Sequence, residues 1–188
     1  MNKREIKLRN AIFALQTRKF GNVTEKLVEI IRKEHGDIVV KAEDDSYDRY
    51  INGKKNEIKG SKVLISTPLN LEKDNIVETI LASHNDNRHI PFNKSSKIKW
   101  VSNIQQIKSK LFKTLWYVLF FEDSVCIFKI TPSQIKDDEK VRYSDKQHRG
   151  NTGEGQFHVN NTNIKHHLDN YLIETITYED VYNKLNKK

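Results

Sequence analysis

The sequence predicts an α/β (α+β) fold, with a mixed central β-sheet flanked by helices. Near-continuous apolar runs at 115–121 and 125–130 are typical of strands covered on both faces. An Asn-Gly pair at 52–53, between two short runs, is the strongest local signal for a two-residue hairpin turn. Helical patterns lie before and after these strands. At 188 residues, the chain is expected to form one domain over 1–188.

Two helices are predicted ahead of the first strand, which is expected at 37–41. The first covers 3–19, and Gly21 is expected to break it. Asn22 then begins the second helix as its N-cap, with Glu25 at N3 in a capping-box pattern. Glu25 is also a possible acidic ligand. Capping is favoured, because Glu25 lies opposite the apolar stripe of that helix, formed by Val23, Leu27, Ile30 and Ile31.

Further helices are expected in the second half of the chain. Ser102 and Gln105 have capping-box spacing, which predicts a helix that ends near Phe112. Thr131 and Pro132 are typical of the start of a short helix. The pattern also predicts a helix at 163–172 and a last one capped by Thr177, ending at Leu185.

The charge of the chain points to a polyanionic partner. Its formal net charge is +8, which favours nucleic acid first and an anionic membrane second, with a solubility effect as the alternative. The single cysteine, Cys126, excludes a disulfide or a cysteine zinc site within one chain. The sequence shows neither a signal peptide nor a run of about 18 apolar residues. We therefore expect a cytoplasmic protein of a bacterium or archaeon that contacts no membrane.

The hairpin carries the candidate chemistry. A two-residue turn at 52–53 places Asp48 opposite Glu57, and opposite Cβ atoms lie roughly 4.5–5.5 Å apart. Lys59 follows Glu57 by two residues, so it lies on the same face. Two acids and an amine that converge in this way suit a hard divalent cation. A solvated face with a weak surface ion pair would give the same spacing.

A polar segment at 137–160 is a second candidate region. It is read as a loop that contains three of the chain's seven glycines and many donor side chains. Such side chains suit contact with base edges or phosphates, whereas a disordered surface loop is the alternative. Arg pairs bidentately with guanine and Gln with adenine, so the candidate DNA-reading residues are Gln147, Arg149 and Gln156.

The pattern Asp48…Glu57-Ile58-Lys59 resembles the PD-(D/E)xK nuclease superfamily, and Type II restriction endonucleases in particular. The likeness covers most of the chain, in the order helix, strand, Asp-bearing hairpin, E-x-K strand, helix and two core strands. Tyr47 stands where the family name writes Pro. The resemblance implies a restriction-endonuclease-like core with a DNA-recognition loop at 137–160.

The resemblance also implies roles for residues. Asp48, Glu57 and the backbone carbonyl of Ile58 would hold Mg²⁺, and Lys59 would orient the attacking water and stabilise charge on the phosphate. The products would carry 5′-phosphates. The implied partners are double-stranded DNA, a second copy of the chain on a palindrome, and a cognate DNA methyltransferase of the same system.

Other functions remain open at this point. One is a repair or junction-resolving nuclease on the same core, and another is a non-catalytic module that binds nucleic acid through its basic surface. An HNH-type site around His166 and His167 is remote, because no ββα pattern surrounds the pair and adjacent helical residues point to different faces.

Overall fold

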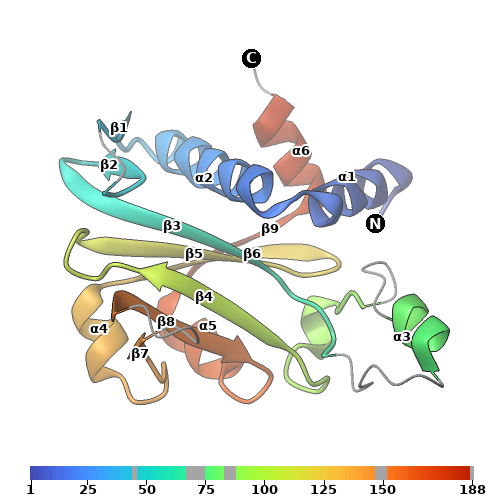
Figure 1. The fold of residues 1–188 in the computed structure, drawn as a ribbon. Coiled ribbons are helices and arrows are strands. Elements are labelled where there is room, and N and C mark those ends of the chain that lie inside the picture. The colour runs from blue at the N-terminus through green and yellow to red at the C-terminus, as the bar shows by residue number, and fades with distance from the viewer. Residues whose placement is uncertain (44–45, 67–74, 83–87, 147–151, 187–188) are drawn as a thin grey trace.

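The computed structural model describes residues 1–43, 46–66, 75–82, 88–146 and 152–186, which form a mixed α/β fold. Its main sheet has the strand order β1-β2-β3-β5-β6-β9 (Figure 1). The strands are β1 (Val39–Lys41), β2 (Arg49–Ile51), β3 (Lys54–Lys62), β5 (Thr114–Phe120), β6 (Ser124–Ile130) and β9 (Leu172–Thr177). Strands β3 and β5 run parallel, whereas the other neighbouring strands described in this sheet are antiparallel.

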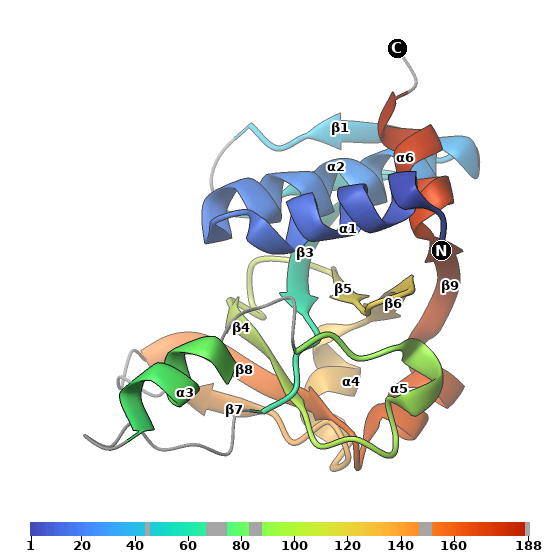
Figure 2. The ribbon, with the colours of Figure 1, turned by 90° about the vertical axis from the view of Figure 1, so that its right-hand side faces the viewer.

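A second, three-stranded sheet lies below the main one, with the order β4-β8-β7 (Figure 2). Its strands are β4 (Val101–Ile107), β7 (Ser144–Lys146) and β8 (Thr152–Asn160). The helices α1 (Lys3–Ala14), α2 (Thr17–Glu34) and α6 (Tyr178–Asn186) cover the opposite face of the main sheet. The smaller helices are α3 (Ile76–Ala82), the 3₁₀ turn η3 (Phe92–Lys94), α4 (Pro132–Asp137) and α5 (Ile164–Tyr171).

The central strands β5 and β6 confirm the expectation drawn from the two apolar runs. Every residue of β5 is buried, and alternate side chains enter two different cores. Leu115, Tyr117 and Leu119 pack toward the second sheet. Trp116, Val118 and Phe120 pack against α1, α2 and α6. Strand β6 is buried in the same way except at Lys129, so both strands are apolar along most of their length.

The start of α2 corrects the predicted helix boundary. The break falls at Leu15 and Gln16, both with extended backbone, and Gly21 lies inside α2. A glycine inside a helix costs about 1 kcal/mol relative to alanine. The buried stripe of α2 offsets that loss; it consists of Phe20, Thr24, Leu27, Val28 and Ile31. The helix ends before Gly36, which has φ 85° just beyond the C-cap residue His35.

Two polar stretches form strands where other structure was predicted. The residues read as a helix from Ser102 form β4, because Ser102, Ile104 and Ile107 are buried against β8. The segment 137–160, read as a recognition loop, contains the last residue of α4, β7 and all of β8. Burial of part of β4 and of β8 outweighs the polar composition there, whereas β7 is exposed and pairs with β8. Strand β9 was not anticipated, whereas α4, α5 and α6 lie where predicted.

Helix α2 lies close to β3, and Gly60 permits this approach. A Cβ atom at Gly60 would collide with Oγ1 of Thr24 and crowd the ring of Phe20. Both residues belong to the buried stripe of α2. The close contact fixes the next turn of α2 above the hairpin, and this placement brings Glu25 to the candidate site.

Candidate functional site

The hairpin forms as predicted. Asn52 and Gly53 have φ values of 49° and 74°, as a type I′ turn requires. The register is confirmed for Arg49 opposite Asn56, Tyr50 opposite Lys55 and Ile51 opposite Lys54. This register carries Asp48 to the end of the β2–β3 ladder, next to Glu57.

At Asp48 the β2–β3 ladder ends, because the side-chain carboxylate replaces the backbone carbonyl as the acceptor of a hydrogen bond from β3. Its amide donates to the carbonyl of Asn56 at 3.0 Å, and its Oδ2 accepts from the amide of Ile58 at 2.7 Å. The carbonyl of Asp48 instead accepts from Nη1 of Arg49 at 2.7 Å. In a strand, the N–H and C=O of one residue point to the same side. The Ile58 carbonyl therefore lies on the Asp48 side of β3.

Glu57 and Lys59 lie on the same face of β3 and form an ion pair. Glu57 is only 9% exposed, so it is not a solvated surface acid. Burial raises the pKa of Glu57, and the negative charges of Asp48 and Glu25 add to this against the opposing effect of Lys59. Three carboxylates thus act on one another at this place.

Glu25 belongs to the site, which corrects its predicted capping role. It lies inside α2, and its carboxylate lines the same cavity as Asp48 and Glu57. Burial raises the pKa of Glu25, Asp48 raises it further, and Arg49 opposes the shift. The sequence could have indicated this position. When Phe20 and Thr24 are counted in the buried stripe of α2, the centre of that stripe lies closer to Glu25.

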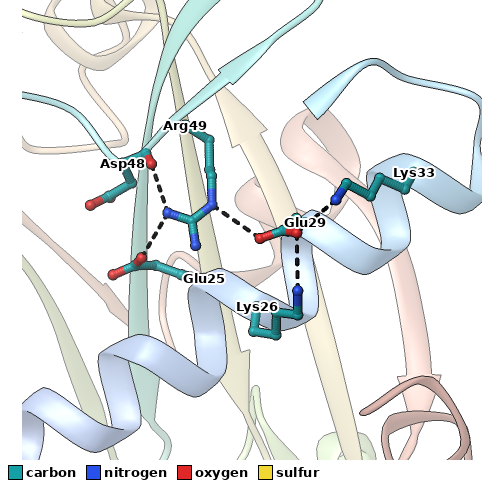
Figure 3. Close-up of polar contacts among 6 residues, drawn as sticks. All are labelled: Glu25, Lys26, Glu29, Lys33, Asp48 and Arg49. Carbon is teal, nitrogen blue, oxygen red and sulfur yellow. Dashed lines mark hydrogen bonds and ion pairs between the residues drawn. The ribbon is translucent and has the colours of Figure 1, made fainter. Parts of the chain in front are cut away.

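Arg49 joins the hairpin to α2 (Figure 3). Its Nη1 donates to Glu25 at 3.1 Å and its Nε to Glu29 at 3.2 Å. Glu29 also accepts from Lys26 at 3.0 Å and from Lys33 at 2.8 Å. The guanidinium is well suited to this bridge, because its donors are arranged in a rigid fork. Sequence reasoning missed this residue.

The side chains of the site line a cavity of ≈ 830 Å³, which we call the hairpin cavity; they are Glu25, Asp48, Arg49, Glu57 and Lys59. One wall is α2, the floor is the hairpin, and the far wall comes from the second sheet. The residues of the far wall are Gln106, Lys108 and Glu154. The cavity thus combines clustered acids with flanking cations, among them Arg18, Lys26 and Lys41.

The donor types at this place suit a divalent cation, although the described side chains are not arranged around one. Glu25, Asp48 and Glu57 offer carboxylate oxygens, the ligands that Mg²⁺ prefers. A cation between them would offset the burial and the mutual repulsion that raise the pKa values of Glu25 and Glu57. Within the described ranges, no three His, Cys, Asp or Glu side chains are already grouped as a metal site. Lys59 and Arg49 instead hold Glu57 and Glu25. Binding of an ion would therefore compete with these two ion pairs.

The candidate DNA-reading residues receive no support from the structure. Gln147 and Arg149 lie outside the described residues. Gln156 lies in β8 and is 6% exposed, with its Nε2 donating to the carbonyl of Lys146 at 3.3 Å. A side chain buried in this way does not present its amide to a base edge in this conformation.

The histidine pair of α5 is divided between two environments, as its adjacent positions predict. His166 bonds to Asp138 at 2.5 Å near the surface. His167 is fully buried and bonds to the hydroxyl of Tyr117 at 2.8 Å. Burial lowers the pKa of His167 to about 4, so it is neutral at ordinary pH. The two rings do not converge on one ligand.

No protein-family model, no curated protein and no solved structure matches this chain. No helix in the described ranges is both long and apolar enough to cross a bilayer.

Proposed function

We propose that this chain is a Mg²⁺-dependent endodeoxyribonuclease that hydrolyses phosphodiester bonds of double-stranded DNA at specific sites, as a Type II restriction endonuclease does. The observation that carries the proposal is the convergence of Glu25, Asp48, Glu57 and Lys59 on the hairpin cavity. The Asp-bearing hairpin forms in the predicted register, and Glu57, Ile58 and Lys59 lie on β3; both features support the proposal.

Asp48, Glu57 and the Ile58 carbonyl would hold the Mg²⁺ ion, with Glu25 as a further carboxylate at the same place. When bound, the ion supplies a Lewis acid for the scissile phosphate and lowers the pKa of water. Asp48 is held in position by the Ile58 amide, and Glu25 by Arg49. Asp48 is therefore positioned before the substrate arrives, whereas Glu25 and Glu57 would exchange their ion-pair partners for the metal.

Lys59 acts on the substrate itself. Its ammonium lies beside Glu57 on the cavity side of β3, where it orients the attacking water and stabilises the negative charge that develops on the phosphate. The water oxygen bonds to phosphorus, the bond from phosphorus to the 3′ oxygen breaks, and the 3′ oxygen takes up a proton. The products are a 5′-phosphate and a 3′-hydroxyl.

Two alternatives share parts of this site. A repair or junction-resolving nuclease would use the same residues on branched or mismatched DNA. A non-catalytic basic module would need the hairpin acids to be surface charges, and the burial of Glu57 together with its raised pKa disfavours this. We assign restriction on the resemblance, with a homodimer acting on a palindromic site and a methyltransferase as its companion.

Digestion of a mapped plasmid, with end sequencing of the products, tests the proposal. Discrete fragments that appear with Mg²⁺ and disappear with chelator would support restriction. Nicking confined to branched or mismatched substrates would favour repair. An Asp48→Ala or Lys59→Ala protein that cuts as well as the unchanged chain would refute the assigned site.

A further inference from the structure

A lysine-rich surface extends from the hairpin cavity around the segment 108–113. Two more cavities adjoin this segment, one of ≈ 470 Å³ and one of ≈ 710 Å³, and both are lined by Lys110 and Leu111. Lys108 lines the first of them and also the hairpin cavity. The three hollows therefore follow one another along the segment 108–113, which joins β4 to β5.

The lining of the two added cavities is strongly basic. They are bordered by eight lysines, which we call the lysine belt: Lys54, Lys55, Lys108, Lys110, Lys113, Lys129, Lys136 and Lys146. Asp145 is the one acidic residue among the described residues that line them. Lys108 pairs with Glu154 at 3.5 Å. For the other seven, the described parts of the chain provide no carboxylate partner.

The belt lies on a fixed scaffold rather than on a loose tail. The amide of Lys113 donates to the carbonyl of Lys55 at 2.8 Å, which ties the segment 108–113 to the hairpin. The amide of Leu111 donates to the carbonyl of Lys108 at 2.8 Å, and Phe112 is buried in the core. Cations held close together without acidic partners repel one another, and a bound polyanion would relieve that repulsion.

We propose that the lysine belt binds the phosphate backbone of the substrate DNA that flanks the cleaved bond. This inference rests on the proposed function, because the hairpin cavity defines where the cleaved phosphate lies. Lys108, shared by two cavities, marks the point where the DNA leaves the cleavage site. The belt contacts phosphates, so it positions the duplex without reading its sequence.

A DNA-binding assay tests the belt. Fluorescence anisotropy measures the binding of a labelled 30-base-pair duplex, and chelator is present so that no cleavage occurs. The variant is the full chain with Lys54→Gln, Lys110→Gln and Lys113→Gln. The matched control removes three exposed lysines elsewhere, by Lys7→Gln, Lys97→Gln and Lys99→Gln. Both triples change the net charge by the same amount, and thermal melts of both verify the fold.

The belt triple is expected to weaken binding at least tenfold at 100 mM salt. It should also reduce the steepness of log K against log salt by about 3, because each lysine removed leaves one phosphate without its cation. The control triple should change the slope by less than about 1. Equal weakening in the two triples, or unchanged binding by the belt triple, would overturn the proposal. So would a belt triple that no longer binds phosphatidylserine vesicles but keeps its affinity for DNA.

The two proposals fail in different ways. An unchanged chain that binds DNA through the belt but never cuts it would refute the nuclease and leave the belt standing. An unchanged chain that cuts DNA while the belt triple binds normally would refute the belt alone.

Discussion

Glu25 and Glu29 lie one turn apart on α2 and share the same guanidinium, yet their environments are opposite. Glu25 faces Asp48 across the cavity, and burial together with that charge raises its pKa. Burial would raise the pKa of Glu29 as well, but hydrogen bonds from Lys33 and Lys26 lower it to about 2. Arg49 therefore binds two acids with opposite effects: ionised Glu25 destabilises the folded state, whereas ionised Glu29 stabilises it.

This difference separates structural acids from candidate ligands. Glu29 is surrounded by cations of the protein, so its charge is already neutralised. Glu25 and Glu57 each have one ion-pair partner, and the charge of Asp48 adds to burial in raising the pKa of both. Carboxylates kept close at the expense of stability are typical of a functional site. This difference supports the proposal that Glu25, Asp48 and Glu57 bind an external cation.

The largest expected effect is on cleavage. Asp48→Asn and Lys59→Met should each reduce the rate of plasmid cleavage by about 10²–10³-fold or more, because each removes a group that acts on the transition state. Initial rates under excess Mg²⁺ measure the effect. Asp169→Asn is the control, since Asp169 is exposed and lines neither the hairpin cavity nor the two cavities of the lysine belt. A similar decrease in the control would remove the distinction between the cavity and the rest of the surface.

The next effect is on stability. Arg49→Leu should lower the free energy of unfolding by about 3 kcal/mol, because it leaves two partly buried carboxylates without their shared partner. Urea denaturation in chelator measures the change. Arg49→Lys should recover only part of that stability, since one ammonium cannot reproduce the two-sided fork. Full recovery by lysine would show that charge alone, without the fork, joins the hairpin to α2.

The paired glutamates are expected to respond with opposite signs. Glu29→Gln should lower the free energy of unfolding by about 1–2 kcal/mol at pH 7, since it removes a carboxylate that three cations hold. Glu25→Gln should raise it by about 1 kcal/mol or less, since it removes repulsion with Asp48. Parallel urea titrations compare them. Two changes of the same sign would contradict the assigned environments.

The smallest effect is a difference in pH dependence. A raised pKa means that the folded state holds the proton more tightly than the unfolded state. The contribution of Glu57 to folding stability is therefore present below the ordinary pKa of 4.5 and is lost as pH rises through the raised value. The contribution of Glu29 is present above 4.5 and is lost as pH falls toward about 2. We expect the free energy of unfolding of each variant, measured relative to the unchanged chain, to change with pH in a different range. The change should fall above pH 4.5 for Glu57→Gln and below pH 4.5 for Glu29→Gln. Coincident curves would argue against the contrast.

Local chemistry was enough to predict the hairpin and the acids on it. Asn52 and Gly53 adopt positive φ with little strain, so they fix the turn, and the turn fixes which residues lie opposite each other. The apolar strands β5 and β6 were equally clear, because burial on both faces leaves no alternation to misread. In each case a few neighbouring residues decide the structure.

Features that depend on distant parts of the chain could not be predicted in this way. Gly21 stays helical because α2 packs on β3, and the predicted break there concealed the true position of Glu25. Ser102 is buried in β4 rather than at a helix start, because β8 pairs with it from more than fifty residues away. Arg49 had no local signal, since its partners lie on a helix 20 and 24 residues earlier.

Titration of Mn²⁺, as a stand-in for Mg²⁺, into the metal-free protein tests most directly whether the three carboxylates share one ion. Calorimetry at pH 7.5 should show a site that is abolished in Asp48→Asn, weakened at least tenfold in Glu25→Gln, and unchanged within about twofold in Glu29→Gln. No binding to the unchanged chain, or equal weakening by Glu25→Gln and Glu29→Gln, would contradict the account.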